Sequence, residues 1–186
     1  GLKDFYMKEY ELKNGQKLII RNTDFGDEQE LINQMKLVDS ETKFLAREPG
    51  EFNFTIEQER EFIKNKKNNK DDLFLIGEID HRIIAQCSIG VVSNYKRYLH
   101  RAAMGIIICK AYWNLGIGKI IMQEGISWCK EKGIEQLELE VVTQNERAIS
   151  LYRKFGFQIC GTKIHALKYG DGTYADEYEM VLFLRD

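Results

Sequence analysis

The chain has 186 residues, of which 44% are hydrophobic and 30% are charged, as is typical of a globular protein with a hydrophobic core. Its formal net charge of −2 gives no support for a nucleic-acid partner, and no apolar run approaches the roughly 18–20 residues that a membrane span needs. We therefore expect one domain over residues 1–186 that binds neither nucleic acid nor a membrane. Residues 1–15 are expected to form an N-terminal extension, in which Gly1 is a remnant of cloning.

The four cysteines and three histidines do not form a metal-binding pattern. Successive cysteines lie at least 20 residues apart, so no Cys-x-x-Cys pair is present. We expect no metal site, and we expect four buried thiols in a reducing cytoplasm. The cysteines are Cys87, Cys109, Cys129 and Cys160.

The first half of the chain predicts three strands and two helices. Thr55 and Gln58 are typical of a capping box at the start of a helix. Asp80-His81 favours a tight turn between two antiparallel strands. In order, we expect a strand at Gln16–Asn22, a helix from Asp24–Asp27 to about Glu41, a loop at Phe44–Phe54, a helix from Thr55 to about Lys66, and strands at Leu73–Ile79 and Ile83–Ser93.

The second half predicts alternating strands and helices followed by a hairpin. Glu138 and Glu140 alternate with apolar residues, which is typical of a strand with one buried face. Asn145 is placed to cap a helix whose buried stripe is Ala148, Leu151, Tyr152 and Phe155. In order, we expect a strand at Ala102–Ile108, a helix from about Gly116 to Lys132, a strand at Gln136–Val142, a helix ending at Gly156, and strands at Phe157–Leu167 and Tyr174–Leu184. The pattern alone indicates an α/β or α+β fold with one sheet.

A glycine-rich turn follows the β-branched run that ends at Ile108. Gly116 and Gly118 would let backbone N–H groups approach a phosphate at the start of a helix, and Lys119 adds a positive charge. A Walker loop is excluded because Ile120 stands where Ser or Thr is needed, and a dinucleotide fingerprint lacks its third glycine at Ile121. A nucleotide-binding domain remains an alternative, in which ATP or NAD would bind here.

A second motif lies downstream, at Asn145-Glu-Arg-Ala-Ile-Ser-Leu-Tyr-Arg-Lys-Phe-Gly-Phe157. The two motifs together resemble the GNAT superfamily of acetyl-CoA-dependent N-acetyltransferases. That family carries [Arg/Gln]-x-x-Gly-x-[Gly/Ala] after its fourth strand and then Asn-x-x-Ala-x-x-Leu-Tyr-x-x-x-Gly-Phe. The resemblance is clearest over residues 100–184. Trp113 departs from it, since it stands where the family usually has Arg or Gln, and we expect its side chain to shape the pantetheine channel.

The resemblance implies a mixed, mostly antiparallel sheet of about seven strands, with helices on both faces and a splay between the fourth and fifth strands. It also implies acetyl-CoA as the cosubstrate and leaves open whether the protein forms a homodimer. Backbone N–H groups near Ile106 and Ile108 would bind the pantetheine and polarise the thioester carbonyl. The cofactor-binding residues implied by the motifs are Ile106, Ile107, Ile108, Trp113, Asn114, Leu115, Gly116, Ile117, Gly118, Lys119, Asn145, Ala148 and Tyr152.

Acetyl transfer to an amine requires a proton for the leaving thiolate and a base for the amine. Tyr152 is expected to be the general acid, although its place on an amphipathic stripe also fits a core tyrosine. Glu140 and His100 are the candidate bases, and each also fits a solvated surface residue. A covalent route through Cys109 lacks an evident partner, so we expect direct attack by the amine.

The acceptor is expected to be a primary amine of a small molecule or a protein N-terminus. Three carboxylates, on Glu48, Glu51 and Glu177, would suit a cationic amine in a site built from the loop Phe44–Phe54 and the last hairpin. The alternative from another class is a non-catalytic domain of the same fold that binds or senses acyl-CoA.

Overall fold

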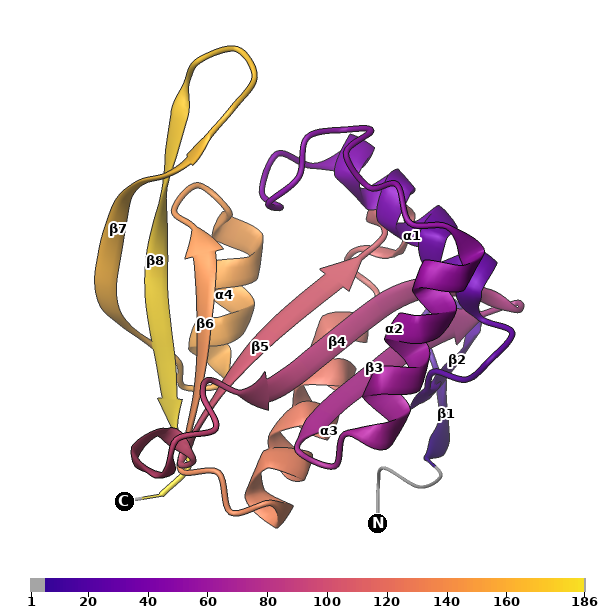
Figure 1. The fold of residues 1–186 in the computed structure, drawn as a ribbon, viewed down its shortest axis with the longest axis horizontal. Helices are drawn as coiled ribbons and strands as arrows, with labels where there is room; N and C mark the ends of the chain where they lie inside the picture. The colour runs from indigo at the N-terminus through magenta and orange to yellow at the C-terminus, as the bar shows by residue number, and fades with distance from the viewer. Residues whose placement is uncertain (1–5, 186) are drawn as a thin grey trace.

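The computed structural model describes residues 6–185, and its eight strands form one sheet (Figure 1). The strands follow the order β1-β2-β3-β4-β5-β6-β8-β7, and every neighbouring pair is antiparallel except β5 and β6. The strands are β1 (Met7–Glu11), β2 (Lys17–Asn22), β3 (Asp72–Ile79), β4 (Arg82–Val91), β5 (Arg101–Ile108), β6 (Gln136–Val142), β7 (Gln158–Lys168) and β8 (Tyr174–Phe183). The expected α/β fold with a mixed, mostly antiparallel sheet is confirmed.

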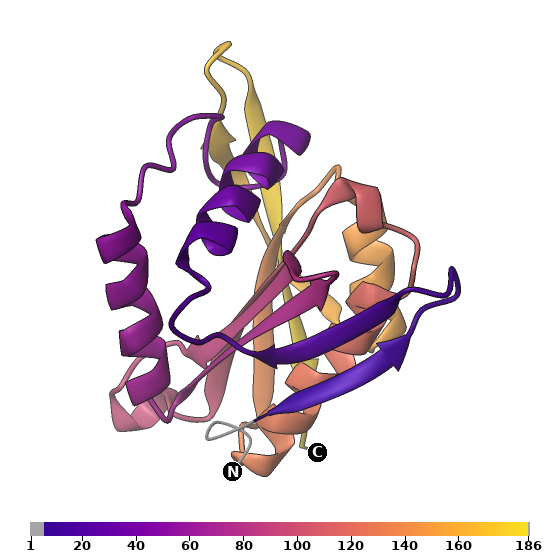
Figure 2. The ribbon, with the colours of Figure 1, turned by 90° about the vertical axis from the view of Figure 1, so that its right-hand side faces the viewer.

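Helices cover both faces of this sheet, as Figure 2 shows. The helices are α1 (Glu28–Glu41), α2 (Ile56–Asn68), α3 (Ile117–Glu131) and α4 (Glu146–Lys154). The strand β3 is buried on both faces, since Leu75 packs in the larger core cluster with α3 and Ile76 packs in a smaller cluster with α1 and α2. This explains why β3 reads as a continuous apolar run in the sequence.

The sheet has one strand more than expected, because β1 forms within the predicted N-terminal extension. Only its Tyr10 is even partly buried, so the strand lacks the apolar alternation by which strands are predicted. It pairs with β2 along the sheet edge, and the Tyr10 hydroxyl donates a hydrogen bond to the Glu124 carboxylate of α3. Lys8 Nζ lies 3.3 Å from the same carboxylate. The strand is thus held by polar contacts that no local pattern reveals. Gly1 lies outside the described residues.

Several local predictions are confirmed by the backbone. Thr55 and Gln58 form both hydrogen bonds of the capping box at the start of α2. Asp80 and His81 have φ values of 50° and 65°, which are those of a tight turn joining two twisted strands. The Asn145 side chain accepts a hydrogen bond from the backbone N–H of Ala148 at 3.4 Å, as expected of a helix cap.

The strands β5 and β6 separate soon after they pair. Their parallel ladder contains only the pairs of Arg101, Ala102 and Ala103 with residues 136–138, whereas β5 stays paired with β4 as far as Ile108. Figure 1 shows the two strands diverging toward their carboxyl ends. The splay that the family resemblance implied is therefore present.

Two expectations about burial are wrong. Cys87, Cys109 and Cys129 are buried, but Cys160 is exposed because it lies on β7, a strand at the edge of the sheet whose side chains are mostly exposed. On α4, Tyr152 is buried, whereas Ala148, Leu151 and Phe155 are only half-buried and line a pocket.

No helix within residues 6–185 is both long and apolar enough to cross a membrane. No group of three or more His, Cys, Asp or Glu side chains in that range could hold a metal ion.

Candidate active site

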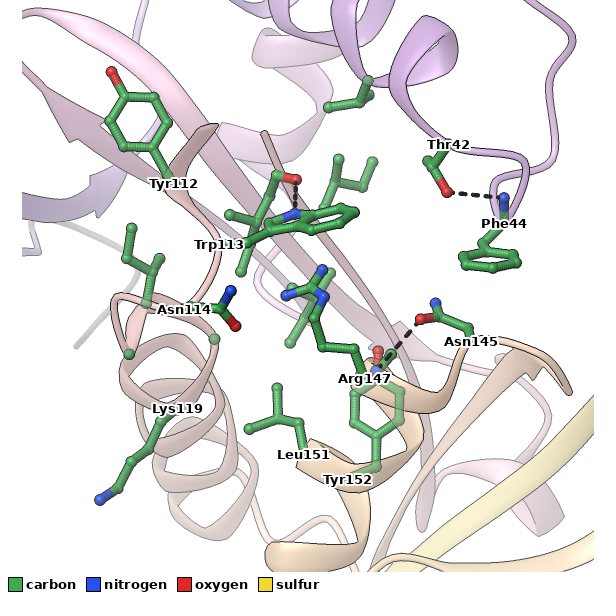
Figure 3. Close-up of a pocket in the computed structure, with 18 of the residues that line it drawn as sticks. Thr42, Phe44, Tyr112, Trp113, Asn114, Lys119, Asn145, Arg147, Leu151 and Tyr152 are labelled. Carbon is green, nitrogen blue, oxygen red and sulfur yellow. Dashed lines mark hydrogen bonds between the residues drawn. The ribbon is translucent and has the colours of Figure 1, made fainter. Parts of the chain in front are cut away.

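A pocket of about 690 Å³ opens where β5 and β6 separate (Figure 3). Its walls come from the end of β5, the turn before α3, the first turns of α3 and α4, and the segment that follows α1. The pocket brings together twelve of the thirteen residues that the motifs suggested for cofactor binding; Leu115 alone is not among its lining residues. They are Ile106, Ile107, Ile108, Trp113, Asn114, Gly116, Ile117, Gly118, Lys119, Asn145, Ala148 and Tyr152.

Backbone groups of β5 face this gap. Cys109 N–H donates to the Ile84 carbonyl at 2.9 Å, which places the hydrogen-bonding groups of the odd-numbered residues of β5 on the β4 side. Those of Ile106 and Ile108 therefore point to the side of β6, whose ladder has already ended at Ala103. An extended ligand with amide groups could pair with this stretch of β5 as a further strand does.

The turn before α3 uses its two glycines in different ways. Gly116 has φ of +84° and open space where a Cβ would lie, so the backbone there is both left-handed and accessible. A Cβ on Gly118 would lie only 2.9 Å from Cδ2 of Leu151, so this glycine lets α3 approach α4 closely. The first N–H groups of α3 then face a space that suits an anion.

Trp113 and Arg147 meet across the pocket. The indole N–H of Trp113 donates to the carbonyl of Ile108 at 3.0 Å, one of the groups that points into the gap. The guanidinium carbon of Arg147 lies 3.6 Å from the centre of the Trp113 ring. Figure 3 shows the Arg147 side chain extending from α4 toward the indole.

Tyr152 is a buried tyrosine that lines the pocket. Burial raises the pKa of its phenol to about 12, the nearby Cys87 thiol acts in the same direction, and the Arg147 guanidinium opposes both. The phenol is therefore protonated throughout the physiological pH range. Its side chain lies on α4 beside the gap between the strands, so a hydroxyl is available there as a hydrogen-bond donor.

The charged side chains around the pocket are mostly positive, although the whole chain carries a net charge of −2. Glu41 is the only acid among the lining residues, and its carboxylate accepts a hydrogen bond from Lys110 N–H at 3.0 Å. Within residues 6–185, none of the lining cations makes an ion pair. The lining cations are Lys13, Lys119, Arg147 and Lys154. This excess of charge suits a ligand with several phosphate groups.

A second cavity of about 640 Å³ adjoins the first, because Glu41, Thr42 and Leu45 line both. It lies between the α1–α2 loop and the β7–β8 hairpin. Two hydrogen bonds join these segments: the Tyr169 hydroxyl donates to the Lys43 carbonyl at 2.6 Å, and Gly170 N–H donates to Glu48 Oε1 at 2.5 Å.

The acids proposed for the acceptor are only partly gathered here. Glu48 and Glu51 line the second cavity, but each carboxylate already accepts a backbone N–H, from Gly170 and Glu48. Glu177 lies elsewhere, beside Glu140, and burial together with that neighbouring carboxyl raises the pKa of Glu177. Glu140 is half-exposed and lies 3.4 Å from Lys163 Nζ. Neither Glu140 nor Glu177 lines either cavity.

His100 and Cys109 are less well placed for chemistry. His100 lies just before β5, at the end where β5 and β6 are still paired, and its carbonyl accepts from Glu135 N–H. The Cys109 thiol is buried, and burial raises its pKa to about 11, so the thiolate needed for a covalent route is disfavoured.

Sequence reasoning missed Arg147 and Glu41. Both lie in helices that the sequence predicts. Their importance depends on contacts with residues that are distant in the sequence, since Arg147 contacts Trp113 and Glu41 contacts Lys110. The one available signal was the position of Arg147 two residues after the Asn145 cap, where a cation faces the positive end of a helix dipole.

The model of the acetyltransferase (GNAT) family matches residues 39–157. An L-amino acid N-acetyltransferase of Escherichia coli, AaaT, is 34% identical over 108 residues, which is 57% of this chain and 65% of that protein. The chain thus spans slightly less than two thirds of that relative. An acetyltransferase of the GNAT family from Streptococcus pneumoniae is 29% identical, with a TM-score of 0.84 over 90% of this chain and 99% of that one. A Salmonella typhimurium protein solved with its cofactor acetyl-CoA is 15% identical, with a TM-score of 0.79 over 91% of this chain and 95% of that one.

Proposed function

Because the chain belongs to the acetyltransferase (GNAT) family, we propose that it transfers an acetyl group from acetyl-CoA to a primary amine, by direct attack and with Tyr152 as the general acid. The observation that carries this proposal is the gap between β5 and β6. There, the part of β5 beyond its ladder with β6, a glycine turn and a buried tyrosine line one pocket.

The pocket fits acetyl-CoA in shape and in charge. The backbone groups of Ile106 and Ile108 offer the pairing that the amides of pantetheine need. The turn at Gly116–Lys119 offers N–H groups and a positive charge for the diphosphate. When bound, acetyl-CoA supplies the acyl group as a thioester. A backbone N–H of β5 would polarise its carbonyl, as in other oxyanion sites.

Tyr152 is proposed to donate the proton that the leaving thiolate needs. A phenol with a pKa of about 12 is a weak acid beside a thiol, whose ordinary pKa is about 8.5. The same burial that raises the pKa of the phenol would also raise that of a thiol in the pocket, because both lose solvation of their charged forms. The mismatch is therefore smaller than the values in water suggest.

Neither Glu140 nor Glu177 lines the two cavities, and this weak support for a general base favours an α-amine as the acceptor. Neutralising a lysine-like amine of pKa about 10.4 at pH 7 costs about 4–5 kcal/mol, whereas an α-amine of pKa about 7.7–8.0 costs only about 1 kcal/mol. Glu140 lies near the splayed end of β6 beside Glu177, and we propose Glu140 as the base, acting through water. Such an arrangement suits an amine that is already partly neutral.

The second cavity is the proposed acceptor site, because it meets the donor pocket at Glu41, Thr42 and Leu45. The E. coli relative named for L-amino acids supports a small α-amine, and a protein N-terminus offers the same chemistry. A cytoplasmic location is part of this proposal, since acetyl-CoA and three buried free thiols fit a reducing compartment.

The test is thiol release from acetyl-CoA with a panel of acceptors. The panel contains free L-amino acids, a short peptide with a free N-terminus, and the same peptide with a blocked N-terminus and one lysine. We expect release with at least one α-amine and little with the blocked peptide. If acetyl-CoA binds but no amine releases thiol, the chain is instead a non-catalytic acyl-CoA-binding domain.

A further inference from the structure

One cation of the donor pocket, Arg147, has no acidic partner among the residues that the structure describes. Arg147 lies in the first turn of α4, two residues after the cap Asn145, where the positive end of the helix dipole disfavours a positive charge. Partial burial lowers the pKa of its guanidinium, which marks the loss of solvation of its charge.

The guanidinium is nevertheless fixed in position. It stacks 3.6 Å from the centre of the Trp113 ring, and the indole is itself held by its hydrogen bond to Ile108. Stacking on the flat face leaves the edge of the guanidinium, with its N–H donors, free to point along the pocket. Trp113 belongs to the segment that leads into the glycine turn, so Arg147 lies on the α4 side of the same pocket whose other wall is that turn.

We infer that Arg147 binds a phosphate group of the acyl donor, with Trp113 as the platform that orients its guanidinium. A fork of N–H donors matches the oxygens of a phosphate, and the interaction would give this cation an anionic partner that residues 6–185 do not provide. The glycine turn and Arg147 would then hold the donor from two sides. This inference rests on the proposed function, since it assumes that the donor carries phosphate.

The test is the affinity of the whole chain for CoA, dephospho-CoA and pantetheine, measured by calorimetry. Arg147→Gln is compared with Arg153→Gln, a matched control that removes the same charge from an exposed position of α4 outside the pocket. We expect Arg147→Gln to weaken CoA binding by roughly 10–100-fold, the range for a hydrogen bond to a charged group. Pantetheine binding should change by less than about twofold, since pantetheine has no phosphate, and Arg153→Gln should leave all three affinities unchanged.

The two phosphate sources of CoA give different results. Equal losses with CoA and dephospho-CoA assign Arg147 to the diphosphate, and a loss with CoA alone assigns it to the phosphate on the ribose. Either result supports the inference. The inference is overturned if Arg147→Gln leaves CoA binding unchanged, or if it weakens pantetheine binding to the same extent.

Thermal unfolding without ligand separates binding from a structural role. Arg147 faces the positive end of α4 and has no acidic partner within residues 6–185, so Arg147→Gln loses mainly the stacking on Trp113 and should lower the unfolding temperature by at most about 2–4 °C. A marked fall, with equal losses for all three ligands, would show that the arginine only supports the fold. If the unsubstituted protein binds none of the ligands, the proposed function itself fails, which is a different outcome from a failure of Arg147.

Discussion

Ala103 of β5 pairs with Glu138 of β6, and this pair is the last rung of the ladder between the two strands. Beyond it, β5 runs on to Ile108 beside β4, while β6 runs on to Val142 beside β8. The sheet thus keeps its continuity on both sides of the gap while leaving one edge of β5 without a partner. The pocket with Tyr152 opens at this edge.

Replacing Tyr152 with Phe should lower turnover by roughly 10²–10⁴-fold, the range for loss of a general acid, while acetyl-CoA affinity stays nearly the same. The phenyl ring preserves the packing against Phe157, whose ring centre lies 5.7 Å away. Steady-state kinetics together with calorimetry would measure both quantities. Tyr112→Phe is the control, because Tyr112 lines the pocket but its hydroxyl points away from Tyr152 (Figure 3). Equal turnover in the two variants would remove Tyr152 from the mechanism.

Replacing Glu140 with Gln should lower turnover at neutral pH by about 10²-fold or more, since a base that accepts the amine proton is lost. The loss should shrink as the pH approaches 9, where an α-amine is neutral without help. Glu179→Gln is the matched control, because Glu179 pairs with Glu140 on the neighbouring strand β8. A pH–rate profile of each variant makes the comparison. An unchanged profile for Glu140→Gln would contradict its role as the base.

Replacing Gly116 with Val should weaken acetyl-CoA binding roughly 10–100-fold, because a branched side chain would occupy the open space beside the turn. The left-handed backbone, with φ of +84°, also implies about 1–2 kcal/mol of strain. Gly133→Val isolates that strain, since Gly133 has φ of +74° and open space at the other end of α3. The unfolding temperature should therefore fall in both variants, but the affinity for acetyl-CoA should fall only in Gly116→Val. Equal affinities would show that the turn does not contact the donor.

Stability should fall as the pH rises above about 9, because burial raises the pKa of the Cys87 and Cys129 thiols from 9.0 to about 12. Below pH 9 both the folded and unfolded chains keep these protons. Between pH 9 and 12 only the unfolded chain releases them, so each thiol lowers the free energy of unfolding by about 1.4 kcal/mol per pH unit.

Urea unfolding between pH 8 and 11 in reducing buffer measures this slope. Cys129→Ala should make the fall of the unfolding free energy with pH shallower by the contribution of one thiol, about 1.4 kcal/mol per pH unit. Cys160→Ser should leave it unchanged, because the Cys160 thiol is exposed. A slope that is identical in Cys129→Ala and in the unsubstituted chain would contradict the prediction.

Most of the fold was predictable because its signals are local. The capping box at Thr55, the turn at Asp80-His81 and the alternation along β6 each need only a few neighbouring residues. The strand β1 was not predicted because its signals are not local. Its stability depends on pairing with β2 and on contacts of Tyr10 and Lys8 with Glu124, more than a hundred residues away.

In the candidate site, too, the features that depend on local motifs were predicted and those that depend on tertiary contacts were not. The lining of the donor pocket followed from two motifs, because the turn at Gly116 and the cap at Asn145 lie within the segments that form its walls. The stacking of Arg147 on Trp113 and the joining of the hairpin to the α1–α2 loop through Glu48 could not be predicted. They depend on how separate elements meet in space.

The most direct test of the central claim is thermal unfolding with acetyl-CoA, compared with ATP and NAD at equal concentration. At about 100 times its dissociation constant, a ligand adds about 2.7 kcal/mol to the free energy of unfolding, which for a chain of this length raises the midpoint by roughly 5–10 °C. We predict such a rise with acetyl-CoA and little change with ATP or NAD. No rise with acetyl-CoA, or an equal rise with either nucleotide, would contradict the assignment of the pocket between β5 and β6 to an acyl-CoA donor.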